Sequence, residues 1–505
     1  MNALIATPRL IALRALRPHQ ERALAELRRS LMSGWRRPLL MLPTGGGKTL
    51  IAAHIAAGAL AKGKRVAFVV PALSLIDQTV AAFEAEGIHA IGVLQGIHPR
   101  TDRDAPIQIC SVQTLARRRR PEVDLVIVDE AHQMHKEIFR WMKDCPNLIF
   151  IGLSATPWSR GLGKFYDALV IAATTRELID AGYLSDFTAF APSEPDLSSV
   201  STVAGDFKQD ELGEAMDKAS ITGDIISTWL QRGEDRPTIA FCVNRNHAKH
   251  VADRFAGAGV AVEYLDGETP REDREAMFAR FRSGATKILC SVGALTTGFD
   301  ADVRCIIDAQ PTKSRILFVQ KLGRGLRTAP GKDRLVILDH AGNHLRLGMV
   351  TDIGQDRLDD GKERQNASHR ARERGEPLPK LCDDCKAVVP RAGRECPNCG
   401  APIQARNEVE AIDGDLVELG ARRTGERHLS IEDKAAFYGE LRGYAAVKGY
   451  NDGWIAHKYR ERIGVWPNDP RIRTATPRAP SEATRGWIIS RNIAFHKAKG
   501  RDAHG

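Results

Sequence analysis

A glycine-rich segment near the amino end constrains the fold more than any other part of the sequence. Three consecutive glycines lie within Pro43-Thr44-Gly45-Gly46-Gly47-Lys48-Thr49, which follows an apolar stretch and opens a helix-like one. Glycine lets the backbone curl so that successive N–H groups face one anion, and the start of a helix adds positive potential. A strand, a glycine-rich turn and a helix in this order are typical of a phosphate-binding loop. A glycine-rich turn with an incidental lysine is the plainer alternative.

This interpretation assigns a role to each polar side chain of the loop and to a later acidic pair. Lys48 would reach the β- and γ-phosphates of a nucleotide, and the Thr49 hydroxyl would hold Mg²⁺. Asp129 and Glu130 follow an apolar stretch downstream. Asp129 fits a water-mediated Mg²⁺ ligand, and Glu130 fits a group that orients the attacking water. Taken alone, the pair also fits an ordinary loop start. The loop departs from the general pattern at Leu42, where that pattern has its first glycine.

Short apolar stretches alternate with helix-like stretches in two regions of similar size. Strands that alternate with helices predict βαβ units and a parallel sheet covered on both faces, so we expect an α/β fold with two such domains. The expected strands are 37–42, 65–70, 107–111, 124–128 and 148–153, then 238–243, 260–264, 287–291, 304–308 and 334–339; the expected helices are 48–61, 75–86, 245–258 and 271–282.

With these motifs the chain resembles the superfamily 2 helicase/translocase ATPases. Asp129-Glu130-Ala131-His132 is similar to the DEAH form of the second motif, and Ser154-Ala155-Thr156 to the third. The resemblance implies that His132, Ser154 and Thr156 couple ATP hydrolysis to lobe movement. Leu16-Arg17-Pro18-His19-Gln20 is similar to the adenine-reading motif. There Gln20 would read the adenine edge and Arg17 would help to hold the base.

The second region carries two further motifs of this family. Leu295–Asp300 is similar to motif V, and Gln320–Arg327 matches the QxxGRxxR motif. The resemblance implies two RecA-like P-loop lobes, with Arg324 and Arg327 as arginine fingers that approach the γ-phosphate from the second lobe. A basic helix with a solvated face is the alternative for these residues alone. The implied catalytic set is Lys48, Asp129, Glu130, Gln320, Arg324 and Arg327; the implied ATP-binding set is Arg17, Gln20, Thr44, Gly45, Gly46, Gly47, Lys48, Thr49, Gly298 and Asp300.

The same resemblance places nucleic acid along both lobes. Pro71–Gln78 and Ser111–Leu115 are similar to the nucleic-acid segments of the first lobe, so Gln78, Thr114 and Thr297 are expected contacts. Near the carboxyl end, aromatic residues are interleaved with Lys458 and Arg460, a pattern that can stack bases and bind phosphates. A small helical core with Trp454, Tyr459 and Trp466 buried is the interpretation we favour for those three aromatics.

Four cysteines form two CxxC pairs, Cys382/Cys385 and Cys396/Cys399, separated by ten residues. Thiolates at this spacing can complete a tetrahedral Zn²⁺ site with no open position, which predicts a structural metal. Two disulfides and an iron–sulfur cluster are the alternatives. The layout of two lobes, cysteine knuckle and tail resembles bacterial RadD-like (YejH-like) DEAH ATPases and related phage proteins. That resemblance implies DNA repair or recombination, with single-strand-binding or recombination proteins as possible partners.

Composition agrees with an anionic partner but not with a membrane. The 505 residues include 73 Lys and Arg against 63 Asp and Glu, a net charge of +10. Residues 471–505 hold eight basic and two acidic residues, so much of the excess lies at the carboxyl end. No apolar run is long enough to span a bilayer. We expect a cytoplasmic protein, although the acid-poor start also fits a transit peptide.

We therefore expect an ATP-dependent DNA helicase or translocase with Mg²⁺, ATP and structural Zn²⁺, acting on single-stranded, branched or duplex DNA. An ATP-switched recombination accessory without processive unwinding and an RNA helicase are the alternatives. The expected segments are lobe 1 over 1–165, an inter-lobe connection over 166–215, lobe 2 over 216–350, a polar linker over 351–380, the zinc knuckle over 381–402 and a basic, mainly helical module over 403–505.

Overall fold

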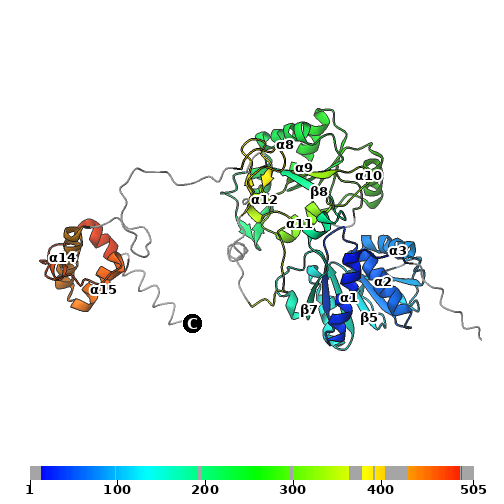
Figure 1. The fold of residues 1–505 in the computed structure, drawn as a ribbon, viewed down its shortest axis with the longest axis horizontal. Helices are drawn as coiled ribbons and strands as arrows, with labels where there is room; N and C mark the ends of the chain where they lie inside the picture. Colours follow the sequence, from blue (N-terminus) through cyan, green and yellow to red (C-terminus); the bar gives the residue numbers. More distant parts are fainter. Residues whose placement is uncertain are drawn as a thin grey trace, which may run out of the picture. The chain divides into compact units, whose positions relative to one another are not determined.

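A computed structural model describes residues 13–96, 98–191, 195–295, 299–362, 378–390, 393–403, 430–489 and 491. The chain divides into two compact units, Met1–Arg406 and Asn407–Gly505, and each is treated by itself (Figure 1). Thr297 and Gly298, two of the expected motif V contacts, lie outside the described residues. None of the described helices is long and apolar enough to cross a membrane.

The first lobe is a parallel sheet of seven strands in the order β3-β4-β2-β5-β6-β1-β7. Every residue of β1, β2, β4 and β5 is buried, as expected for strands covered on both faces. The strands are β1 (Pro38–Met41), β2 (Val66–Val70), β3 (Ile91–Leu94), β4 (Ile107–Ser111), β5 (Leu125–Val128), β6 (Ile149–Ser154) and β7 (Ala168–Ile171). The main helices are α1 (Pro18–Met32), α2 (Lys48–Leu60), α3 (Ile76–Ala85), α4 (Val112–Leu115), α5 (Lys136–Asp144) and α6 (Thr175–Asp180).

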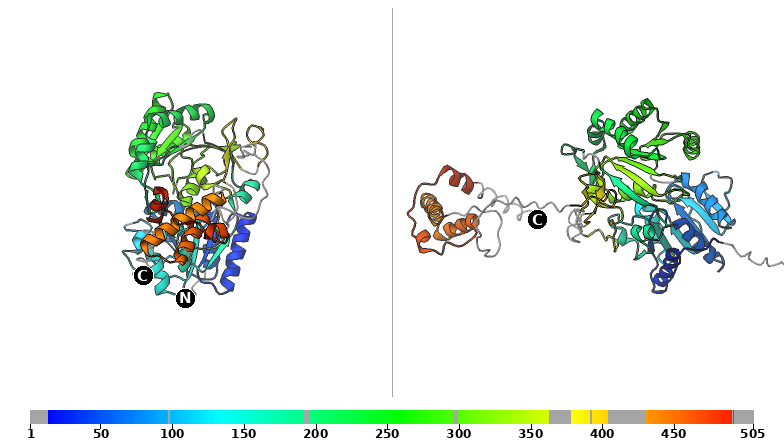
Figure 2. Two further views of the ribbon diagram at one scale, coloured as in Figure 1. Left: turned by 90° about the vertical axis from the view of Figure 1, so that its left-hand side faces the viewer. Right: turned by 45° about the horizontal axis from the view of Figure 1, so that its top comes forward.

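The second lobe is a parallel sheet of six strands in the order β12-β13-β11-β14-β15-β8. Its strands are β8 (Asp186–Phe190), β11 (Thr238–Cys242), β12 (Val262–Leu265), β13 (Ile288–Ser291), β14 (Cys305–Ala309) and β15 (Arg334–Asp339). Its helices include α7 (Gln209–Met216), α8 (Ala219–Arg232), α9 (Arg245–Gly257), α10 (Arg271–Ser283), α11 (Arg315–Gly323) and α12 (Asn343–Leu347), and a hairpin is formed by β9 (Thr202–Val203) and β10 (Asp206–Phe207). The two-lobed α/β architecture is thus confirmed (Figure 2).

The stretch expected to connect the lobes also contributes to both sheets. β7 pairs with β1 at the edge of the first sheet, and β8 pairs with β15 at the edge of the second. Neither strand alternates cleanly: β7 has one fully buried residue and β8 has two. β8 mixes Asp186 and Thr188 with apolar residues and so gives a weak hydrophobic pattern, whereas β7 is a run of four apolar residues that was not recognised as a strand.

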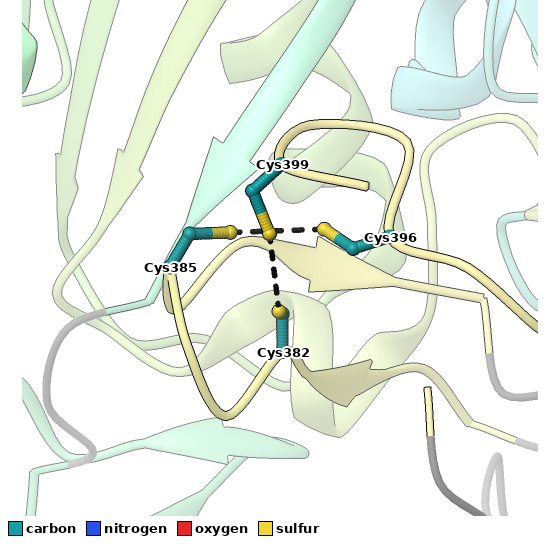
Figure 3. Close-up of side chains that lie close together, drawn as sticks. All are labelled: Cys382, Cys385, Cys396 and Cys399. Carbon is teal, nitrogen blue, oxygen red and sulfur yellow. Dashed lines mark hydrogen bonds between the residues drawn. The ribbon is translucent and has the colours of Figure 1, made fainter. Parts of the chain in front are cut away.

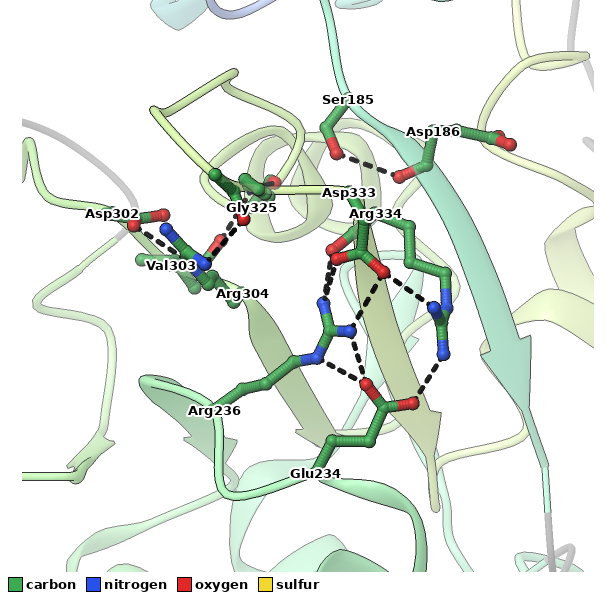
Figure 4. A network of polar contacts seen from close by, with 12 residues as sticks. Ser185, Asp186, Glu234, Arg236, Asp302, Val303, Arg304, Gly325, Asp333 and Arg334 are labelled. Carbon is green, nitrogen blue, oxygen red and sulfur yellow. Dashed lines mark hydrogen bonds and ion pairs between the residues drawn. The ribbon is translucent and has the colours of Figure 1, made fainter.

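A polar network ties together the amino ends of two strands of the second lobe (Figure 4). The Arg236 guanidinium lies 2.8 Å from Asp333 Oδ1, and it donates a 2.8 Å hydrogen bond to the Arg334 main-chain oxygen and a 2.7 Å one to Glu234. Its hydrogen bond holds the pKa of Asp333 well below the usual range. The network lies just before β11 and β15 begin, and so at the opposite end of the sheet from the loops that carry the motifs.

The cysteine-rich segment packs on the second lobe. It contains the strands β16 (Lys380–Leu381) and β17 (Val388–Val389). Ala387 bridges to Phe190 of β8, and the Ala191 N–H donates a 3.3 Å hydrogen bond to the Lys386 main-chain oxygen. The buried Cys382 and Cys396 share a hydrophobic cluster with Phe190 and the sheet of the lobe. The segment therefore covers the edge strand β8 and is not an isolated knuckle.

The second unit is a small helical domain with its own core. It contains α14 (Ile431–Lys448), α15 (Asp452–Ile463), α16 (Pro470–Arg473) and a helical stretch over 482–489. Tyr459 is fully buried among Phe437, Tyr438 and Leu441, and Trp454 packs partly against them. Burial is confirmed for Tyr459, but the expectation was wrong for Trp466, which is 39% exposed because it follows the last turn of α15.

Candidate nucleotide and metal sites

The phosphate-binding loop joins β1 to α2 and is held in shape by its glycines. Gly45 and Gly47 adopt φ values of +85° and +93°, a left-handed conformation that favours glycine. A Cβ on Gly47 would lie 2.1 Å from Gln20 Nε2, and one on Gly46 would lie 2.7 Å from the side chain of Leu42. Leu42 therefore packs under the loop at the position where the general pattern has its first glycine.

A cavity of about 340 Å³ opens beside this loop and collects polar residues from both lobes. Phe299 and Asp300 precede β14, and Arg324 and Arg327 follow α11, so the second lobe forms one wall. Expected site residues that line it are Thr44, Gly45, Gly47, Lys48, Thr49, Asp129, Glu130, Asp300, Arg324 and Arg327. Gln78, expected on the nucleic-acid side, also lines this cavity.

The charged groups of the cavity are poorly solvated. Burial lowers the pKa of Lys48, although Glu130 and Asp129 oppose this effect, and Lys48 Nζ donates a 3.2 Å hydrogen bond to the Leu42 main-chain oxygen. Burial, and then the charge of Glu130, raises the pKa of Asp129 to about 7. Burial and the charge of Arg327 lower the pKa of Arg324 to about 10. A bound phosphate and a divalent cation would supply the opposite charges that these groups lack.

The residues present fit a nucleotide–Mg²⁺ complex. Glu130 Oε2 is buried without a hydrogen bond among the described residues, so it remains an available acceptor for water. Thr49 and Asp129 supply the hydroxyl and carboxylate oxygens that Mg²⁺ prefers. Backbone N–H groups at the start of α2 and the two arginines can neutralise phosphate oxygens.

His132 connects this acidic strand end to the second lobe. Gln320 Nε2, which can only donate, lies 2.9 Å from His132 Nε2, so that ring nitrogen accepts. His132 Nδ1 then carries the proton and donates to Ser154 Oγ at 2.9 Å, and Ser154 Oγ also accepts from the Thr156 N–H at 3.0 Å. Burial lowers the pKa of His132, which favours this neutral ring. The three expected coupling residues thus form one hydrogen-bonded chain that ends at Gln320.

Gln20 and Arg17, the residues expected to contact adenine, lie beside the phosphate-binding loop. Gln20 Nε2 donates a 3.0 Å hydrogen bond to the Gly46 main-chain oxygen, while Gln20 Oε1 accepts from the Arg17 N–H at 2.9 Å. His19 Nε2 lies 2.9 Å from the same oxygen. The Arg17 guanidinium lies over the ring of Tyr183, 4.7 Å from its centroid. Tyr183 could not be predicted from the sequence, because it stands in a short loop after α6 with no motif around it.

Three of the expected nucleic-acid contacts are already engaged within the protein. Thr114 is buried and its hydroxyl lies 3.0 Å from Ser111 Oγ. Lys458 pairs with Glu461 at 2.7 Å. The Arg460 guanidinium lies 4.6 Å from the ring centroid of Trp466 but remains exposed.

A different group of cations in the second unit surrounds a cleft of about 670 Å³. Lys448, Arg478 and Arg485 line it together with Tyr444. Tyr444 stacks on Trp454 with centroids 5.9 Å apart, and Trp454 packs against Tyr450 at 4.6 Å. Among the residues that the structure describes, Lys448 and Arg485 have no acidic partner. The feature of the sequence that indicated this cleft was the interleaving of aromatic and basic residues. It predicted that the two kinds of side chain lie near one another.

The four cysteines converge at one point (Figure 3). Their sulfur atoms all lie within 4.8 Å of one another, although they come from two separate turns. Each turn is followed by a residue in the left-handed conformation, Lys386 with φ +60° and Gly400 with φ +74°. Four thiolates arranged in this way fit a structural Zn²⁺ with every position filled by protein.

Comparisons with known proteins agree with the two-lobed arrangement. Residues 14–159 match the family described as "Type III restriction enzyme, res subunit", and residues 217–329 match "Helicase conserved C-terminal domain". The chain is 27% identical to a "51.5 kDa protein" of a Lactococcus phage over 75% of this chain and 83% of that protein. It is 29% identical to the Saccharomyces cerevisiae protein IRC3, named as a candidate ATP-dependent helicase, over 65% of this chain and 51% of that protein.

Two further similarities concern restriction enzymes. The "Type I restriction enzyme EcoKI endonuclease subunit" of Escherichia coli is 24% identical over 62% of this chain, which spans 33% of that longer protein. A fragment of a candidate HsdR subunit of a type I restriction enzyme from Vibrio vulnificus has a TM-score of 0.53 at 20% identity, over 70% of this chain and 68% of that one. The second similarity shows a shared fold.

We predict that Lys48→Ala and Glu130→Gln each lower ATP turnover at least about 100-fold, because each removes a group poised at the phosphates or the attacking water. Phosphate release by the purified chain measures this. Lys64→Ala is the matched control, because Lys64 is exposed and pairs with Asp124 before β5 begins, away from the cavity. A wild-type rate in either site variant contradicts the assignment.

We also predict about one zinc per chain by elemental analysis, since four thiolates close a tetrahedral site. Cys396→Ser should release the metal and lower the thermal midpoint, because Cys396 is also part of the core on β8. Cys145→Ser serves as the control, because Cys145 lies outside the cluster. Iron in place of zinc, or no metal at all, would overturn the zinc interpretation.

Proposed function

Because the chain belongs to the superfamily 2 helicases and hydrolyses ATP, we propose that it couples this hydrolysis to movement on, or remodelling of, DNA. The observation that supports coupling most directly is the hydrogen bond between His132 of the first lobe and Gln320 of the second. The matched restriction-enzyme family and the EcoKI similarity favour DNA over RNA. A role in repair or recombination, as in RadD-like ATPases, is the finer part of this proposal.

We propose the following division of labour in the ATP site. Lys48 and the backbone of the loop hold the phosphates, while Thr49 and Asp129 hold the magnesium. Glu130 positions water and accepts its proton, and Arg324 and Arg327 stabilise charge as it develops on the transferred group. Mg²⁺ adds further neutralisation when it is bound. Gln20 and Arg17 would contact the base, and Asp300 would contact the nucleotide from the second lobe.

The coupling follows from the two-lobed construction of the site. Arg324 and Arg327 belong to one lobe and Lys48 to the other, so the cavity is complete only while the lobes are closed. His132, Ser154 and Thr156 transmit the state of the acidic strand end to Gln320 through hydrogen bonds. Hydrolysis that reopens the lobes would alter their grip on a strand bound across both.

We predict that DNA raises the steady-state ATPase rate and that RNA of the same sequence does not. Phosphate release with single-stranded DNA, duplex DNA and RNA tests this, with Lys48→Ala as the control for contaminating activity. Stimulation by RNA alone would contradict the DNA assignment. A strand-displacement assay on forked DNA completes the test: ATP turnover without displacement would favour an ATP-switched accessory over a helicase.

We further propose that the cleft of the second unit binds a DNA strand, with Lys448 and Arg485 at phosphates and Tyr444 against a base. Arg485→Ala should weaken binding of a labelled oligo-dT and lower the slope of log K against log salt by about 0.7, the value for one lost single-strand phosphate contact. Fluorescence anisotropy over a KCl series measures both.

Arg471→Ala is the matched control for this prediction. It removes the same charge from the same unit, but Arg471 lies outside the cleft and pairs with Asp469 at 2.8 Å. Equal losses in the two variants would show a nonspecific charge effect and contradict the cleft assignment. Point variants test the cleft more specifically than truncation near residue 470, because truncation would also remove Ile472 and Ile488 from the core.

A further inference from the structure

After the second lobe is complete, the chain returns to the first. α12 ends at Leu347 in the second lobe, yet Leu358 packs against the hydrophobic cluster under the first sheet. On the way, Thr351 Oγ1 accepts a 3.0 Å hydrogen bond from Arg176, which follows β7. Between Lys380 and Ile403 the described residues lie on the second lobe again. Residues 351–361 therefore form a strap from one lobe to the other.

Asp359 is the principal polar anchor of this strap. Its main-chain oxygen accepts a 2.7 Å hydrogen bond from the Gly163 N–H. Its carboxylate Oδ1 accepts from the Gly161 N–H at 2.9 Å and from the Gly361 N–H at 2.6 Å. A Cβ on Gly163 would lie 3.1 Å from the Asp359 main-chain oxygen, and Gly161 and Gly361 have φ values of +80° and +76°. The fit is thus made by backbone that only glycine adopts easily.

The loop that Asp359 holds leads directly to His132. Gly161 follows the third motif, whose last strand residue is Ser154. Within the same loop, Ser159 Oγ donates a 2.5 Å hydrogen bond to the His132 main-chain oxygen. The Leu162 N–H donates back to the Ser159 main-chain oxygen at 3.2 Å. Asp359 therefore holds the backbone of this loop at Gly161 and Gly163, and Ser159 of the same loop holds His132, the residue that contacts Gln320.

We propose that Asp359 is a positioning residue for ATP hydrolysis, which fixes the Ser159–Gly161 loop and through it the His132–Gln320 contact between the lobes. This inference rests on the proposed coupling of hydrolysis to lobe closure. The strap continues the chain of the second lobe and is hydrogen-bonded to the first lobe. Its contacts with the first lobe and the closure of the two lobes therefore stabilise the same arrangement. Asp359 is not among the residues that line the cavity, so it acts through the loop.

The test compares three variants of the full chain. Asp359→Ala removes the acceptor for two N–H groups and should lower kcat for DNA-stimulated ATP hydrolysis about tenfold, while KM for ATP stays within about twofold because the phosphate-binding loop is untouched. Asp359→Asn keeps an acceptor oxygen and should restore most of the rate. Asp360→Ala is the matched control, because the neighbouring Asp360 is exposed and contacts only Lys362 among the described residues.

A double-mutant cycle with Ser159→Ala separates positioning from general stability. If both residues act through His132, the loss in kcat for the double variant should be clearly smaller than the product of the single losses. Multiplicative losses, no rescue by Asp359→Asn, or equal rates for Asp359→Ala and Asp360→Ala would each overturn the proposal. Thermal melts of every variant report whether a lost rate is only lost folded protein, and that result would also overturn it.

A negative result for Asp359 can be told apart from failure of the proposed function. If DNA does not stimulate the wild-type chain, the DNA motor assignment fails. The same variants compared on basal turnover still decide the role of Asp359, because the His132–Gln320 contact belongs to the ATP site itself.

Discussion

The hydrogen bond between His132 and Gln320 is the contact on which the arrangement of the ATP site depends. It joins the acidic end of β5 to the helix that delivers Arg324 and Arg327, so both lobes meet at one cavity. The approach is close enough to exclude side chains: a Cβ on Gly323 would lie 2.8 Å from that of Thr44. Arg324 and Arg327 of one lobe thus reach the glycine-rich loop of the other lobe without an intervening layer.

The part of the fold that could be predicted was the part with local signals. Central strands such as β2 and β4 are buried on both faces and therefore read as continuous apolar runs. The edge strand β8 mixes polar and apolar residues and lacks that signal, whereas the edge strand β7 is a short apolar run that was not recognised as a strand. Motif spacing predicted site roles for Lys48 and Arg324, which both line the cavity, but it did not predict that Gln78 of α3 also lines it. The positions of Tyr183 and Trp466 were also not predicted. Both residues stand in turns after a helix, where helical periodicity says nothing about the exposure of a side chain.

The sequence predicts the convergence of the four cysteines but not the contacts of the strap. CxxC spacing predicts convergence of four sulfurs, because one turn brings each pair together and one metal joins the pairs. Nothing near Ala387 predicts that its backbone bridges to Phe190, and nothing near Asp359 predicts Gly161 as its partner. The first is a backbone bridge and the second joins the Asp359 carboxylate to a backbone N–H. Both connect segments far apart in the chain, and they tie the described parts of residues 351–403 to the two lobes.

The net charge of +10 likewise does not indicate which surface would bind the proposed DNA strand. Lys48, Arg324 and Arg327 face the ATP cavity, and Lys321 is fully buried with Asp308 at 2.5 Å. A buried pair of this kind holds α11 in place and contributes nothing to a surface potential. Among the residues that the structure describes, Lys448 and Arg485 have no acidic partner, so their neutralisation by phosphate would cost no existing ion pair there. The pairing of each cation is therefore a better guide than the total charge to the surface that would bind the proposed DNA strand.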